Sequence, residues 1–130
     1  MPISGFHHVA MKVFDLDKSI EFYKAIGAEV KRAWGEGASR AVMIGVGCDS
    51  CLELFAGGPQ PPQQAGFVGH FAFRTDDAAA ALAAAVAAGA VVTVPLKEVT
   101  IQSTPEPLPV KLAFCTGPDG EVIEFFQPLC

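Results

Sequence analysis

The hydrophobic and polar positions at the start of the chain alternate first with a period of two and then with a helical spacing. Over Phe6–Phe14 the apolar side chains fall on one face, and small, polar or titratable ones fall on the other. This alternation is typical of a strand. Apolar residues then recur at helical spacing, which predicts a helix capped by Asp15 or Asp17 and ended at Gly27.

The rest of the first half predicts three strands separated by turns. They are Glu29–Trp34, Arg40–Val46 and Cys51–Ala56. Gly57–Gly66 has three prolines and no periodicity, which predicts a linker. Cys48 and Cys51 are expected to be free thiols that flank a hairpin turn at Asp49 and Ser50 as small buried residues, although their spacing is also that of half a zinc or redox site.

The second half of the chain repeats the first. The stretch His8–Asp15 returns in altered form as His70–Asp77, and the same interval separates Gly27 from Gly89. An internal repeat of this kind indicates one module that occurs twice. The second copy has the same order of one strand, one helix and three strands. The first strand is predicted at Gly69–Thr75, and Asp76 or Asp77 caps the helix. The three later strands are predicted at Val91–Pro95, Val110–Cys115 and Val122–Gln127. Between the first and second of these later strands, Pro95–Pro109 predicts a proline-rich loop.

Composition and charge exclude several classes of protein. The chain has 130 residues, of which 51% are hydrophobic, so we expect a folded globular protein. The net charge of −5 and the absence of a basic run argue against a nucleic-acid partner. Ala78–Val92 is uncharged but too short and too rich in alanine to span a membrane. Because no secretory signal precedes the first strand, we expect a cytoplasmic protein.

One histidine and one glutamate recur at matching places in the two copies. Glu53 and Glu124 lie among apolar residues of the last strand of each copy, and alternation turns both toward the face that carries His8 and His70. A buried carboxylate is costly unless it is paired, hydrogen-bonded or bound to a metal. Two imidazoles and two carboxylates suit zinc, nickel, cobalt, iron or manganese, so we expect these four residues to hold one divalent metal ion. The alternative is that all four residues are structural, with their polar groups satisfied by hydrogen bonds within the protein.

These residues carry a family resemblance. The chain resembles the vicinal oxygen chelate superfamily, which includes glyoxalase I, methylmalonyl-CoA epimerase, fosfomycin and bleomycin resistance proteins, and extradiol dioxygenases. The motifs that carry the resemblance are His8–Asp15, Ser19–Tyr23, Gly69–Ala72 and Gly117–Glu124. It implies an α+β fold of tandem βαβββ modules, in which a mixed sheet forms a cupped, barrel-like cleft with the helices outside. It also implies metal ligands on the first and last strands of each module, and those positions are His8, Glu53, His70 and Glu124.

The repeat and the resemblance together predict the organisation of the chain. We expect a single domain over residues 1–130, with a first module at 3–56, the linker at 57–66 and a second module at 67–127. Small modules with open sheet edges tend to pair, so we also expect a homodimer.

The resemblance implies a glyoxalase-like, metal-dependent lyase or isomerase. Its substrate would be a small oxygen-bearing metabolite bound to the metal through two oxygens, with Glu124 or Glu53 moving a proton beside a carbonyl. Lys12 and Arg74 occupy equivalent positions on the cleft face. They are expected either to bind an anionic group of the substrate or to be solvated charges at the rim. Three aromatic residues are candidates for the apolar walls of the cleft or for core packing, namely Phe55, Phe126 and Trp34.

Two other functions within the family stay open. A non-catalytic protein that binds a small molecule or an antibiotic would need no metal. An extradiol dioxygenase is less favoured, because its iron site uses two histidines and one carboxylate and a second glutamate would be surplus. Glyoxalase I has an arginine and an asparagine where this chain has Lys12 and Gly57, so glutathione is not the expected substrate.

Overall fold

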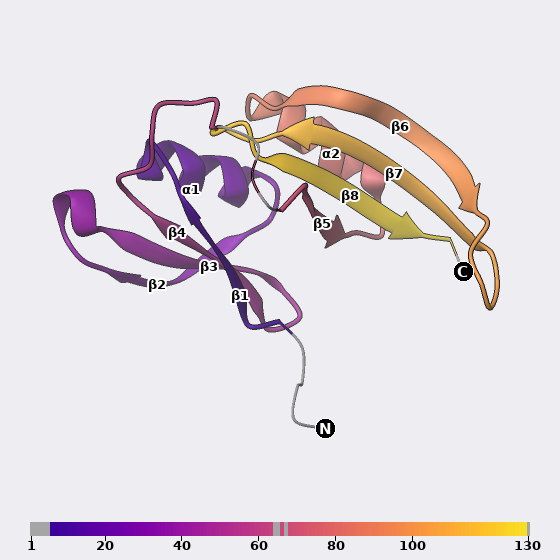
Figure 1. The fold of residues 1–130 in the computed structure, drawn as a ribbon, viewed down its shortest axis with the longest axis horizontal. Coiled ribbons are helices and arrows are strands. Elements are labelled where there is room, and N and C mark those ends of the chain that lie inside the picture. Colours follow the sequence, from indigo (N-terminus) through magenta and orange to yellow (C-terminus); the bar gives the residue numbers. More distant parts are fainter. Residues whose placement is uncertain (1–5, 64–65, 67, 130) are drawn as a thin grey trace. The chain divides into compact units, whose positions relative to one another are not determined.

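A computed structural model describes residues 6–63, 66 and 68–129 of the chain. The chain divides into two compact units, residues 1–61 and residues 62–130. Within the described residues each unit contains one α-helix and one mixed four-stranded sheet that is open and curved (Figure 1). The predicted α+β fold of two βαβββ modules is therefore confirmed.

The first unit has its strands in the order β1-β4-β3-β2. Its elements are β1 (His8–Lys12), α1 (Leu16–Ala25), β2 (Glu29–Trp34), a short 3-10 helix (Gly37–Ser39), β3 (Ala41–Gly47) and β4 (Ser50–Phe55). β1 runs parallel to β4, and the other neighbours are antiparallel. The apolar face of α1 packs on the sheet and supplies Phe22 and Tyr23 to a core that also contains Ile44 and Leu54. Burial of each such side chain stabilises the unit by about 1.5–3 kcal/mol.

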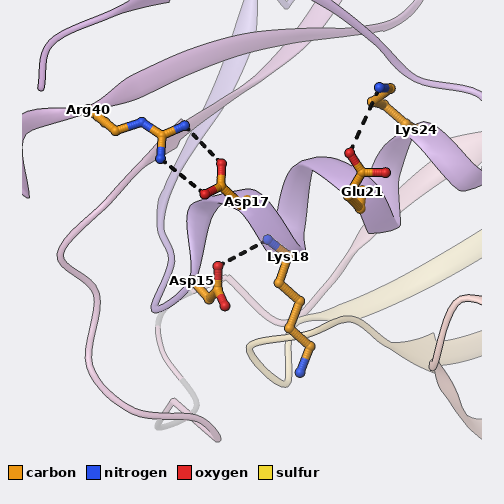
Figure 2. A network of polar contacts seen from close by, with 6 residues as sticks. All are labelled: Asp15, Asp17, Lys18, Glu21, Lys24 and Arg40. Atoms are coloured by element: carbon orange, nitrogen blue, oxygen red, sulfur yellow. Dashed lines mark hydrogen bonds and ion pairs between the residues drawn. The ribbon is translucent and has the colours of Figure 1, made fainter. Parts of the chain in front are cut away.

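The start of α1 is fixed by two carboxylates with different partners. Asp15 is the N-cap, and its Oδ1 accepts a hydrogen bond from the backbone N–H of Lys18 at 3.1 Å. Asp17 lies in the first turn, and its carboxylate accepts two hydrogen bonds from the Arg40 guanidinium in a bidentate ion pair. The N–O distances are 2.9 and 3.4 Å (Figure 2). Of the two predicted caps, Asp15 is therefore the correct one. The pair of Asp17 and Arg40 ties the first turn of α1 to the residue that precedes β3.

The second unit has its strands in the corresponding order, β5-β8-β7-β6. Its elements are β5 (Phe71–Arg74), α2 (Ala78–Ala87), β6 (Val91–Ile101), β7 (Leu108–Thr116) and β8 (Val122–Pro128). α2 is capped by Asp77 and packs on the sheet through the small buried side chains Ala78 and Ala85. As predicted, Gly27 and Gly89 come directly after the C-cap residues of the two helices. Their φ angles are +109° and +105°, a conformation that glycine adopts without steric cost.

One predicted loop proves to be mostly strand. The sequence predicts a proline-rich loop over Pro95–Pro109. In the structure β6 continues to Ile101 and β7 begins at Leu108. β6 is an edge strand of its sheet, and Pro95 lies where the register with β7 shifts, between Val94 and Lys97. A proline is tolerated there, because an edge or bulge position does not need the missing N–H.

The turn between β3 and β4 is shifted by one residue from the expected turn at Asp49 and Ser50. Gly47 is the register partner of Ser50, so the loop consists of Cys48 and Asp49 alone. Both loop residues have positive φ, +49° and +60°, as a tight hairpin turn requires. The expectation that Cys48 would be buried is wrong, because it forms the turn itself and is exposed.

The two described α-helices have ten residues each. Neither is long and apolar enough to cross a membrane.

Candidate metal site

In the first unit, parallel pairing of β1 with β4 brings a histidine and a glutamate together. Ala10 is the register partner of Glu53, and His8 is the partner of Cys51 two residues earlier. Because alternate residues share a face, the side chains of His8 and Glu53 project from the same side of the sheet. The Nε2 of His8 lies 3.5 Å from Oε1 of Glu53, and the glutamate side chain is only 15% exposed.

The second unit repeats this arrangement. Ala72 is the register partner of Glu124, and His70 lies one residue before β5. The Nε2 of His70 is 3.1 Å from Oε1 of Glu124, whose side chain is 10% exposed. Leu52, Leu54, Ile123 and Phe125, which flank the two glutamates along their strands, are buried. The predicted facing of the two carboxylates, away from the apolar face, is therefore confirmed.

His7 has a contact that the sequence reasoning did not assign. By strand alternation, a residue next to His8 turns its side chain to the opposite face, which packs on the helix. In the structure His7 is exposed, and its Nδ1 lies 2.9 Å from Nδ1 of His8. One of these two nitrogens must carry the proton of the hydrogen bond. The contact therefore restrains the ring orientation and tautomer of His8.

A further pair of side chains borders the two glutamates from the third strand of each module. Met43 on β3 is the register partner of Glu53, and Phe114 on β7 is the partner of Glu124. The Phe114 ring packs edge-on against His70, with ring centroids 5.1 Å apart. Sequence reasoning missed both residues, since their placement depends on the antiparallel register across the hairpin.

The expected substrate-binding residues lie farther along the same faces. Lys12 is the register partner of Phe55, and Arg74 is the partner of Phe126. Both basic residues are exposed, and both aromatic residues are half-buried. Trp34 on β2 is 44% exposed, and its ring lies edge-on to Phe55 with centroids 6.4 Å apart. In each unit a basic and an aromatic residue thus accompany the His–Glu pair.

The donor atoms of the candidate ligands come as two pairs, one in each unit. Across the described residues, no group of three or more His, Cys, Asp or Glu side chains is positioned to hold a metal ion. Two ligands bound to one ion at about 2.0–2.2 Å are separated by roughly 3.0–3.5 Å. The distances of 3.1 and 3.5 Å within the pairs match that separation. Each pair is therefore suited to supply two ligands, and the use of all four on one ion stays a prediction.

The sequence as a whole matches one protein family. The profile of the Glyoxalase/Bleomycin resistance protein/Dioxygenase superfamily matches residues 5–125. Comparison with curated protein sequences finds no match.

Several solved structures share the fold. TnmS3, an antibiotic binding protein from a Streptomyces species, is 25% identical with a TM-score of 0.67, and the match covers 98% of each chain. A glyoxalase I variant from Zea mays is 24% identical with a TM-score of 0.75, over 96% of this chain but only 47% of that one. A variant of the fosfomycin resistance protein FosX from Listeria monocytogenes is 19% identical with a TM-score of 0.70, over 95% of this chain and 89% of that one. The FosX structure contains Mn(II) and 1S,2S-dihydroxypropylphosphonic acid.

Proposed function

The chain belongs to the Glyoxalase/Bleomycin resistance protein/Dioxygenase superfamily, and from that premise we propose that it is a metal-dependent lyase or isomerase of the glyoxalase type. The proposed substrate is a small metabolite with two neighbouring oxygens that both reach the metal. The observation that carries the proposal is the pair of equivalent His–Glu contacts, 3.5 Å in the first unit and 3.1 Å in the second.

The four residues of these contacts would hold the metal ion. His8 and His70 offer imidazole nitrogens, and Glu53 and Glu124 offer carboxylate oxygens, a donor set that suits zinc, nickel, cobalt, iron or manganese. The match between the contact distances and the separation of two ligands on one ion supports this assignment. When bound, such a cation acts as a Lewis acid that polarises a substrate oxygen.

Proton transfer is assigned to a glutamate, and we propose Glu124 before Glu53. A carboxylate accepts a proton from carbon more readily where water is largely excluded. The Glu124 side chain is the less exposed of the two, at 10% against 15%. Phe114 is its register partner on β7 and packs on His70, so the Glu124 carboxylate has an aromatic neighbour where Glu53 has Met43.

The remaining residues of each face would select the substrate. Arg74 and Lys12 lie two residues beyond the strand positions opposite Glu124 and Glu53, where their charges would attract an anionic group. Phe126, Phe55 and Trp34 would contact the carbon skeleton. A small anionic hydroxy- or oxo-compound is the substrate class that this set favours.

Hydrogen exchange at carbon tests the proposed reaction. The metal-loaded chain is incubated in D₂O with a panel of small anionic α-hydroxycarbonyl compounds, and deuterium incorporation beside the carbonyl is followed by proton NMR. We expect exchange with at least one compound, and a loss of about 100-fold or more in Glu124→Gln. Glu21→Gln, on the exposed surface of α1, is the matched control. Exchange that is equally fast in Glu124→Gln would contradict the role of Glu124.

Non-catalytic binding is a second candidate, because the antibiotic binding protein TnmS3 matches 98% of this chain at 25% identity. Under this alternative the faces bind a small apolar ligand and the metal is dispensable. Ligand affinity would then be unchanged in the double variant His8→Ala, Glu124→Gln. Under the enzymatic proposal the same variant loses both metal and turnover.

We also propose that the protein is a homodimer. β2 and β6 are edge strands of their sheets, as are β1 and β5 at the other edges, and all six residues of β2 are exposed. Open edges of this kind favour pairing with another chain. Sedimentation equilibrium would show a mass of two chains, and a single-chain mass at micromolar concentration would contradict the proposal.

A further inference from the structure

The edge strand β2 carries an arginine in line with one of the candidate metal ligands. Arg32 is the register partner of Met43, which is in turn the partner of Glu53. Register partners project from the same face of a sheet, so Arg32 lies on the face that carries the pair of His8 and Glu53. Neighbouring strands are about 4.8 Å apart, which separates the backbones of Arg32 and Glu53 by roughly 10 Å. The equivalent position of the second unit holds Val94.

The guanidinium of Arg32 is not neutralised by the chain. Among the residues that the structure describes, no carboxylate lies within ion-pair distance of it. Its Nη1 is 3.3 Å from the carbonyl oxygen of Lys31, which is long for a hydrogen bond of this type. The neighbouring cations differ, since Lys31 contacts Glu29 at 3.3 Å and Arg40 contacts Asp17 at 2.9 Å. Arg32 therefore offers its forked N–H donors to an anion from outside the chain.

An exposed aromatic surface lies beside Arg32 on the same face. Trp34 is two residues farther along β2, and alternate residues of a strand share a face. Its ring meets that of Phe55 edge-on, with centroids 6.4 Å apart. Ala41, the register partner of both aromatic residues, is only 1% exposed, as expected where two rings close over a small side chain. Trp34 itself stays 44% exposed, so much of its surface is open to a ligand.

We propose that Arg32 and Trp34 form a specificity subsite for an aromatic carboxylate portion of the substrate. The carboxylate accepts parallel hydrogen bonds from the Arg32 guanidinium, and the aromatic ring packs on the Trp34 indole. This inference rests on the proposed function, because the oxygens at the other end of the same substrate reach the metal site. A molecule that spans both places is longer than a three-carbon metabolite. The substrate class is thus an aromatic acid whose two metal-binding oxygens are distinct from its carboxylate.

Titration with 3-phenylpropionate, followed by NMR, tests the subsite. Trp34 is the only tryptophan of the chain, so its indole N–H signal reports occupancy of this place directly. The full chain is used as purified, without added metal. We expect a saturable shift of that signal with 3-phenylpropionate, and binding about tenfold or more weaker for 3-phenylpropanol, which lacks the carboxylate, and for butyrate, which lacks the ring. Arg32→Gln should weaken binding of 3-phenylpropionate about tenfold or more and leave that of 3-phenylpropanol unchanged.

A matched variant separates a local contact from an effect of net charge. Lys18→Gln removes one positive charge from the exposed surface of α1 and should bind 3-phenylpropionate as wild type does. The backbone amide signals of the same spectra establish that each variant is folded. Equal affinity of Arg32→Gln and wild type for 3-phenylpropionate, or no saturable shift in wild type, would overturn the subsite. Because no metal or turnover is involved, this failure is distinct from a failure of the proposed enzymatic activity.

Discussion

The Nε2 atom of His70 lies 3.1 Å from Oε1 of Glu124. Glu124 is on β8, and His70 directly precedes β5, the strand that runs parallel to β8. His8 and Glu53 have the same relationship in the first module, at 3.5 Å. Each contact depends on register, because a slip of one residue between the strands would turn one side chain to the opposite face. The core beneath the strands therefore supports the geometry of the candidate ligands.

Truncation of that core should cost much more stability than truncation of the surface. Leu54 is fully buried next to Glu53 on β4. Leu54→Ala should lower the free energy of unfolding by about 2–5 kcal/mol, through lost burial and the cavity left behind. Val91→Ala, at a residue 64% exposed, should change it by less than about 0.5 kcal/mol. Urea denaturation measures both, and equal losses would contradict the assigned core.

The contact between Asp17 and Arg40 should make stability depend on pH in the acid range. The Arg40 guanidinium, through its hydrogen bond first and its charge second, holds the pKa of Asp17 below the ordinary value of 3.8. A lowered pKa in the folded state means that the stabilisation is complete above the ordinary value and is lost as the pH falls through the lower folded value. Compared with wild type, Asp17→Asn should be less stable at neutral pH, and the difference should vanish in acid. A difference that stays constant with pH in thermal unfolding would refute this.

Cys115 should resist alkylation while the fold is intact. Burial first, and the nearby Glu121 carboxylate second, raise the pKa of the Cys115 thiol above the ordinary value of 9.0. Since the thiolate is the reactive form, iodoacetamide should modify exposed Cys48 and leave Cys115 intact. Addition of urea above the unfolding midpoint should expose Cys115 to the reagent. Peptide mapping follows both sites, and equal rates on the folded chain would contradict the assigned burial.

Much of the fold and of each His–Glu pair is predictable, because both rest on local periodicities. Alternation places Glu53 and Glu124 on the faces of His8 and His70, and it needs no knowledge of the partner strands. The extended β6 is not predictable in this way, since Pro95 is typical of a loop and is tolerated here at a register shift in an edge strand.

The residues that border the two glutamates cannot be predicted from a local pattern either. Phe114 and Met43 lie beside the carboxylates because of antiparallel register across a hairpin. In β3–β4 that register includes a shift between Gly45 and Gly47, which no period reveals. The contact of His7 with His8 likewise depends on side-chain rotation rather than on strand alternation.

Single ligand variants should weaken metal binding without unfolding the chain. His70→Ala removes one nitrogen donor and leaves the Glu124 carboxylate without its contact at 3.1 Å. We expect a loss of about tenfold or more in the affinity for zinc or nickel, measured by competition with a chromogenic chelator. His7→Ala should have a smaller effect, because His7 contacts His8 and is not among the four proposed ligands. Unchanged affinity in His70→Ala would exclude it as a ligand.

The central claim is that a His8–Glu53 pair and a His70–Glu124 pair together hold one divalent ion. Metal content of the tag-free, chelator-stripped and reloaded protein, measured by elemental analysis beside the protein concentration, tests it most directly. The account predicts one ion per chain, whether the two pairs meet within a chain or across a dimer, and loss of that ion in the double variant His8→Ala, Glu124→Gln. A wild-type chain that takes up no zinc, nickel, cobalt, iron or manganese, or a double variant that keeps a full equivalent, would contradict it.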